Sequence, residues 1–149
     1  MIKKTLALIC CICAVFAAVF SAGCGRDYLK MPDDPLVFRP FTFEDVSDDP
    51  QGFEAITYSD RTYVVYGTLR DSLKLEEVVS EVLGYRYSEN APDDRSELVI
   101  KLNGTDDYLM VYYADAFMQP PVFYRALDTE GQDIYTPDYI ESYGDSIWD

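Results

Sequence analysis

The sequence contains no histidine, and this absence removes two kinds of chemistry. Histidine is the usual general base near neutral pH and the commonest metal ligand in proteins. Catalytic triads that depend on histidine and ordinary zinc sites are therefore excluded. A glycine-rich phosphate-binding loop is also missing, because "YGTL" and "VLGY" each contain a single glycine.

Basic residues are scarce: 12 Lys and Arg stand against 27 Asp and Glu, for a formal net charge of −15. So acidic a surface repels nucleic acid and anionic lipid headgroups, and we expect neither as a partner. A basic peptide or a divalent cation would suit it better. The simplest role of the charge is to keep a surface protein soluble.

Cysteine is absent after Cys24. The other three cysteines, Cys10, Cys11 and Cys13, lie within an apolar run, where they serve as small hydrophobic residues. If residues 1–23 are removed, Cys24 is the only cysteine left, so no intramolecular disulfide can form.

Residues 1–23 have the three parts of an export signal: the basic residues Lys3 and Lys4, an apolar run over residues 6–20, and small residues after it. The run is short for a membrane span, which needs about 20 apolar residues. We therefore predict a cleaved signal peptide, with an uncleaved membrane anchor as the alternative.

The end of this signal, "FSAGC", resembles the lipobox of bacterial lipoproteins. Ala22 and Gly23 match the two small positions before the cysteine, whereas Ser21 stands where an aliphatic residue is usual. The resemblance implies that Cys24 receives a diacylglyceryl group and becomes the new N-terminus. Cleavage after Gly23 by an ordinary signal peptidase, which would secrete the protein, remains the alternative.

A diacylglyceryl cysteine would place the chain at the extracytoplasmic face of the cell membrane. Two acyl chains hold a protein stably, while one binds only marginally. The lipid anchor through Cys24 is thus the first expected partner.

Residues 24–52 contain four prolines and several acids, and they show no sustained period. This composition is typical of an extended tether. Its middle, "FRPFTFEDV", is too apolar for a simple linker, and we expect it to dock as an edge strand that alternates Phe41 with Phe43.

Residues 53–149 are expected to form an α+β domain with about five antiparallel strands and one main helix. "EAITYSDRTYVVYGTL" predicts two strands that turn near Ser59 and Asp60. "ELVIKLN", "YLMVYYA" and "VFYRAL" predict three more, of which "YLMVYYA" is apolar on both faces and therefore central. "TPDYIESYG" begins like a short second helix.

The main helix is predicted over residues 71–84, "DSLKLEEVVSEVLG". Its apolar residues follow the i, i+3, i+4, i+7, i+8 spacing of one buried helical stripe. These residues are Leu75, Val78, Val79, Val82 and Leu83.

Paired acids are the only candidates for catalysis. They occur at Asp48 with Asp49, at Asp93 with Asp94, and at Asp106 with Asp107. Two carboxylates can act as acid and base in glycoside hydrolysis, but adjacent acids in turns are usually solvated. "NGTDD" lacks the spacing of a known calcium loop. We predict no catalytic constellation, no metal site and no cofactor.

The 13 tyrosines all follow Cys24 and suit a recognition surface, because the ring is large and apolar and its tip is polar. Cross-strand pairing that only stabilises the sheet is the alternative. The candidate surface, for a protein or glycan partner, comprises Tyr63, Tyr66, Tyr112, Tyr113 and Tyr124.

The stretch that begins "DRTYVVYGTLRDSLKLEEVVSEVLGY" and the stretch that begins "YLMVYYADAFMQPPVFYRAL" resemble a set of small exported proteins of Gram-positive bacteria without an assigned role. The resemblance implies one unit and supplies no site residue. We therefore expect a membrane-anchored lipoprotein whose domain binds a partner at the cell surface. A glycan hydrolase outside the cytoplasm that uses two carboxylates is the alternative.

Overall fold

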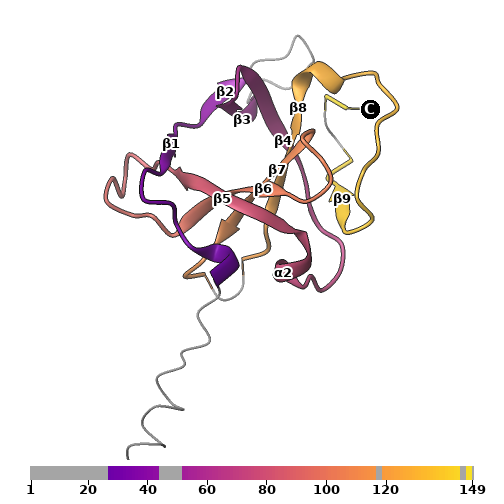
Figure 1. The fold of residues 1–149 in the computed structure, drawn as a ribbon. Coiled ribbons are helices and arrows are strands. Elements are labelled where there is room, and N and C mark those ends of the chain that lie inside the picture. The colour runs from indigo at the N-terminus through magenta and orange to yellow at the C-terminus, as the bar shows by residue number, and fades with distance from the viewer. Residues whose placement is uncertain (1–26, 44–51, 117–118, 145–146, 149) are drawn as a thin grey trace, which may run out of the picture.

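The computed structural model describes residues 27–43, 52–116, 119–144 and 147–148, and its regular structure is almost entirely β-strand (Figure 1). The longest helix of the described residues is α2 (Leu75–Val78), and η1 (Asp27–Leu29) and η2 (Leu127–Thr129) are 3-10 turns of three residues each. The predicted α+β class is therefore wrong, and the domain is mainly β. None of the helices described has the length and apolar character needed to cross a bilayer.

The strands form one mixed sheet rather than the five-stranded antiparallel sheet predicted. They are β1 (Leu36–Phe38), β2 (Phe41–Phe43), β3 (Phe53–Tyr58), β4 (Arg61–Leu69), β5 (Val79–Arg86), β6 (Glu97–Leu102), β7 (Tyr108–Tyr113), β8 (Val122–Ala126) and β9 (Ile140–Ser142). Their order is β1-β5-β6-β7-β8-β4-β3-β2, with β9 paired to β4. Among the strands that the structure describes, only β1 and β5 pair in parallel. β7 lies near the middle of the sheet, as its two apolar faces predicted.

The sheet curls into a half-barrel, so that its two ends come close together (Figure 1). β1 and β2 are its opposite ends, yet only Arg39 and Pro40 separate them in the chain. The rings of Phe38 in β1 and Tyr58 in β3 lie 6.2 Å apart between centroids. We call residues 36–43 the closing segment. The edge strand expected at Phe41 and Phe43 is part of it.

The turn between β3 and β4 is where the sequence predicted it. Ser59 and Asp60 both have positive φ, 48° and 63°. Positive φ at both central residues belongs to the two-residue type I′ turn, whose twist matches that of the flanking strands. Asp tolerates this conformation better than most residues, which explains why the hairpin was readable from sequence.

The main helix predicted over residues 71–84 is wrong except for the single turn α2, because residues 71–74 are not helical and Val79 begins strand β5. The register of β5 against β6 shifts twice, between Val79 and Glu81 and between Val82 and Gly84. Each β-bulge adds a residue, so that residues three apart point to the same face. Val79 and Val82 therefore share one face of the sheet, and Leu83 lies on the other. The two bulges give these buried residues a spacing that is also typical of an amphipathic helix.

The second predicted helix is also wrong, since its sequence contains strand β9. β9 pairs with the end of β4 and continues along the same edge that β3 occupies at the start of β4. A Cβ on Gly67 of β4 would lie 2.0 Å from the backbone oxygen of Glu141. The missing side chain at Gly67 thus allows β9 to approach, and buries Ile140 (2 % exposed).

Both faces of the sheet are buried. The inner face of the curl gathers Phe38, Ile56, Tyr63, Leu83, Val99, Leu109, Val111, Tyr124 and Ala126. The outer face packs under three flanking segments: residues 28–31, residues 73–75 and residues 134–140. Arg125 (8 % exposed) lies on this outer side, where it donates to the backbone oxygens of Thr129 and Gln132 and stacks at 4.8 Å on the Trp148 ring.

Candidate functional site

A pocket of about 400 Å³ lies where the two ends of the sheet meet. The closing segment contributes Arg39 and Pro40, and β5 with the residues after it contributes the rest. The lining residues are Arg39, Pro40, Arg86, Tyr87, Ser88 and Glu89. A volume of this size falls in the range of small-molecule sites.

Arg39 is held over the face of Tyr87, with its guanidinium carbon 4.1 Å from the ring centroid. The Tyr87 N–H donates to the Phe38 carbonyl at 2.8 Å, which fixes the ring next to β1. Among the described residues, no carboxylate forms an ion pair with Arg39. A stacked guanidinium that keeps its N–H donors available is well suited to bind a carboxylate.

Arg86 also lines the pocket, and its guanidinium already binds two carboxylates. Its guanidinium bonds both oxygens of Glu54 in β3 and one oxygen of Glu97 in β6. Burial alone would lower the pKa of Arg86, but the bonds to Glu54 and Glu97 outweigh it and raise that pKa. Because β5 and β3 lie near opposite ends of the sheet, the Glu54–Arg86 pair also fastens the curl.

Tyr124 completes this network by donating its hydroxyl proton to Glu54. Burial, and secondly the charge of Glu54, raise the pKa of Tyr124 far above its usual value. The hydroxyl therefore stays protonated and serves as a fixed donor. The group of Glu54, Arg86 and Glu97 carries one net negative charge behind the pocket.

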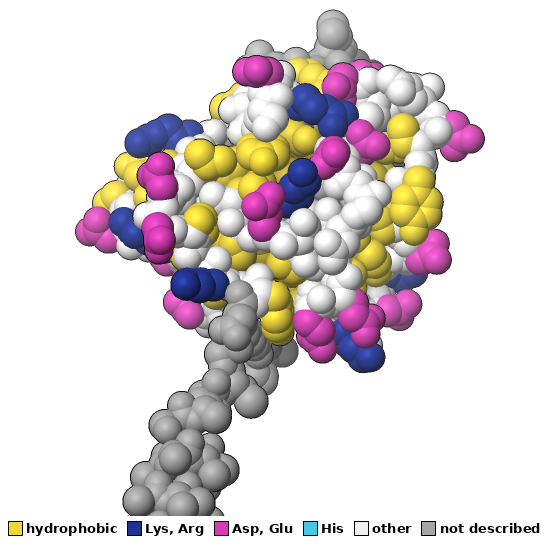
Figure 2. All heavy atoms as spheres, viewed as in Figure 1, with side chains coloured by type: hydrophobic (Ala, Val, Ile, Leu, Met, Phe, Trp, Pro, Cys, Tyr) yellow, Lys and Arg dark blue, Asp and Glu magenta, His cyan; other side chains and the backbone are white. Residues whose placement is uncertain are grey.

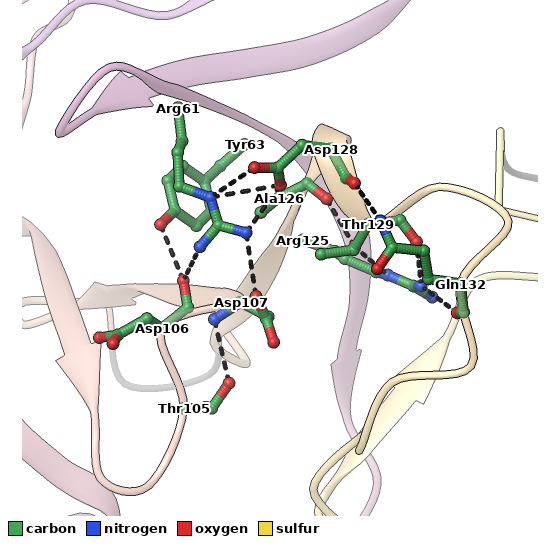
Figure 3. A network of polar contacts seen from close by, with 10 residues as sticks. All are labelled: Arg61, Tyr63, Thr105, Asp106, Asp107, Arg125, Ala126, Asp128, Thr129 and Gln132. Carbon is green, nitrogen blue, oxygen red and sulfur yellow. Dashed lines mark hydrogen bonds and ion pairs between the residues drawn. The ribbon is translucent and has the colours of Figure 1, made fainter.

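The second polar cluster joins three connections at the ends of interior strands: the β3–β4 turn, the β6–β7 turn and η2 (Figure 3). Arg61 bonds Asp128 through two nitrogens, Asp107 at 2.9 Å and the backbone oxygen of Asp106 at 2.8 Å. Tyr63 donates to the same Asp106 oxygen. The hydrogen bond from Arg61 lowers the pKa of Asp128, which holds this carboxyl ionised. A general acid requires the opposite shift.

The paired acids do not come together as one site. Asp106 and Asp107 are held by Lys101 and by Arg61 respectively. Asp93 and Asp94 lie exposed in the loop before β6, where the backbone N–H of Ser96 lowers the pKa of Asp94. Asp48 and Asp49 lie outside the described residues, as does Cys24. The hollow of about 570 Å³ beside Asp106 and Asp107 is thus lined by acids that already have cationic partners.

The five tyrosines of the candidate surface divide between the two faces of the sheet. Tyr63, Tyr113 and Tyr124 belong to the inner face, and Tyr66 and Tyr112 to the outer face. Tyr63 and Tyr124 are 2 % exposed, and their hydroxyls bond a backbone oxygen and a carboxylate. Tyr66 packs edge-on against Tyr108, 5.5 Å away. The structure therefore does not bring the five rings together on one surface.

The pocket residues were not predicted from the sequence. Arg39 interrupts the apolar stretch "LVFRPF" between β1 and β2, and Arg86 stands between two tyrosines at the end of β5. A charged residue within an apolar stretch is the available signal, because it must face a partner or an opening. The partners themselves, Glu54 and Glu97, come from strands distant in sequence.

These features define a class of protein: a small, mainly-β domain with a charged pocket at the point where its curled sheet closes. Comparison of the chain with protein-family models, with curated proteins and with solved structures finds no significant match.

Proposed function

We propose that the chain is a lipid-anchored binding module of the extracytoplasmic membrane face, and that the pocket of the closing segment is its ligand site. The observation that carries the proposal is the available guanidinium of Arg39, stacked on Tyr87 at the mouth of a pocket of about 400 Å³. The anchor rests on the lipobox-like residues that end at Cys24.

The surroundings of the pocket support a binding role. Leu36, Val37 and Phe41 of the closing segment are 43–48 % exposed and account for three of the five large apolar side chains most exposed among the described residues. Grouped exposed apolar side chains commonly mark an interaction site. They flank Arg39 in the chain, so a ligand longer than the pocket could extend over them.

The ligand site is tested by thermal shift. The full chain, as processed by the cell and kept in detergent micelles, is heated with a panel of short peptides, glycan fragments and organic acids. We expect at least one class to raise the melting temperature of the wild type and of Arg95→Gln, but not of Arg39→Gln. Arg95 is the matched control, because it is exposed, stacks on Tyr85 at 5.2 Å and does not line the pocket. Equal shifts in all three proteins, or none, would contradict the assignment.

The anchor is tested by metabolic labelling. Labelled fatty acid should enter the wild type and Cys13→Ser, because Cys13 lies in the signal that is removed, but not Cys24→Ser. Equal labelling of the two serine variants would overturn the lipoprotein assignment.

A further inference from the structure

The pocket contains two opposite charges that do not neutralise each other. Arg39 and Glu89 both line it, and neither forms an ion pair with any described residue, including the other. Both side chains are exposed to solvent. Arg70, Arg95 and Arg125 likewise form no ion pair with a described residue. What distinguishes Arg39 is that it lines the pocket together with an unpaired carboxylate.

The backbone holds both charged residues in fixed positions. Tyr87, under the guanidinium of Arg39, is bonded to β1 through its N–H. Ser88 accepts a hydrogen bond from the Ala91 N–H at 3.2 Å, which closes a tight turn with Glu89 inside it. Ser88 also lines the pocket and adds a hydroxyl that can donate or accept.

Electrostatics decides which ligand suits this arrangement. A simple anion would be attracted by Arg39 but repelled by the chain as a whole, whose formal net charge is −15. On the face drawn in Figure 2, Asp and Glu side chains are more frequent than Lys and Arg. Arg86 adds little attraction for an anion, because the two negative charges of Glu54 and Glu97 exceed its single positive charge. A ligand without net charge escapes the repulsion, and its cationic end is favoured by Glu89 and by the negative group behind Arg86.

We propose that the pocket binds a zwitterion, a free amino acid or a short peptide with both termini unblocked. Arg39 receives the carboxylate and Glu89 the ammonium group, and Ser88 bonds the atoms between them. This inference rests on the proposed function, since it names the ligand class of the same pocket. A volume of about 400 Å³ accommodates a dipeptide.

The ligand class is tested by calorimetric titration of the full chain in micelles with alanine, dialanine and trialanine. The peptide that fits the spacing of the two charges should bind best. Its N-acetylated and its C-amidated forms should each bind about tenfold or more weakly, because each loses one charge-assisted contact.

Two variants assign the ends of the ligand. Arg39→Gln should weaken the unblocked peptide about tenfold and leave the amidated form unchanged. Glu89→Gln should weaken the unblocked peptide and leave the acetylated form unchanged. Arg95→Gln and Glu130→Gln, which change the same charges outside the pocket, should bind like the wild type.

The outcomes separate this inference from the proposed function. If a ligand binds in an Arg39-dependent manner but tolerates acetylation and Glu89→Gln, the pocket is a carboxylate site and the zwitterion is refuted. If peptides bind equally to wild type and to both pocket variants, the zwitterion is again refuted. If nothing in the thermal-shift panel depends on Arg39, the proposed ligand site fails as well.

Discussion

Gly84→Ala should lower the free energy of unfolding by about 3 kcal/mol, a large share of the stability of a small domain. A Cβ at this position would lie 1.9 Å from the carbonyl oxygen of Leu36 and 2.6 Å from its nitrogen. Both atoms are backbone, so no side-chain rotation can relieve the clash. β1 must move away from β5, and Phe38 then leaves the inner core (4 % exposed at present).

Two other glycines provide controls. Gly104→Ala meets no atom within 4 Å but has a φ of 78°, and should cost about 1 kcal/mol from backbone strain. Gly67→Ala meets Glu141 at 2.0 Å and should destabilise as much as Gly84→Ala, by displacing β9. Fluorescence of Trp148, the only tryptophan, reports unfolding in denaturant.

Ligand binding distinguishes the effect of Gly84→Ala, at the contact of β1 with β5, from that of Gly67→Ala, at the contact of β9 with β4. Gly84→Ala displaces the closing segment and should abolish Arg39-dependent binding at temperatures where the protein is still folded. Gly67→Ala should retain it, because β9 lies on β4 and not at the pocket. If Gly84→Ala were as stable as Gly104→Ala, the backbone of β1 would not lie close to β5 at Gly84.

The sequence predicted local structure correctly where a short run of residues favours one backbone geometry. The turn at Ser59 and Asp60 and the strand at "ELVIKLN" depend on neighbouring residues only, and both are found. Sheet order, the parallel pairing of β1 and the length of the sheet depend on contacts between distant segments, which no local pattern encodes.

β5 shows why a clear pattern can mislead. Periodicity identifies a helix only if every residue advances the chain by a constant angle. Two bulges break that condition, and the resulting spacing of Val79, Val82 and Leu83 is shared by a helix and a bulged strand. The β-branched valines, which favour strands, were the contrary local signal. The close approach of the Leu36 backbone to Gly84, which allows β1 to pair with β5, is visible only in three dimensions.

The candidate site was less predictable than the fold. Arg39 gains its role from Tyr87, nearly fifty residues later in the chain, and Arg86 from Glu54 and Glu97 on two different strands. The tyrosine-rich composition indicated an unusual role for tyrosine. In the structure, several of these rings fill the two cores of the sheet, which is the stabilising alternative considered for them.

The burial of these tyrosine rings predicts that the protein loses stability rapidly at alkaline pH. Burial is the largest cause that raises the pKa of five tyrosines, Tyr63, Tyr108, Tyr113, Tyr124 and Tyr139. Above pH about 10, tyrosines of the unfolded chain lose their protons while these five keep theirs. The unfolded state then binds fewer protons, so stability is complete below pH about 10 and falls as the pH rises.

The free energy of unfolding should fall steeply as the pH rises above about 10. Each such tyrosine contributes up to about 1.4 kcal/mol per pH unit, and five together up to about 7. Since small domains are stable by about 5–15 kcal/mol, the protein should unfold cooperatively within about two pH units above 10. Tyrosinate absorbance should rise in the same transition in which Trp148 fluorescence changes. Gradual ionisation without unfolding would contradict the burial of these hydroxyls.

Tyr113→Phe removes one of the five hydroxyls that make the free energy of unfolding depend on alkaline pH. The hydroxyl of Tyr113 is half-buried and has no hydrogen-bond partner among the described residues, so stability near neutral pH should change little. The dependence of the unfolding free energy on alkaline pH should become shallower, by up to about 1.4 kcal/mol per pH unit. Tyr124→Phe should lower stability at every pH as well, because Glu54 loses its donor. Identical slopes for the wild type and Tyr113→Phe would show that this ring ionises freely in the folded protein, and that the inner core admits water up to β7.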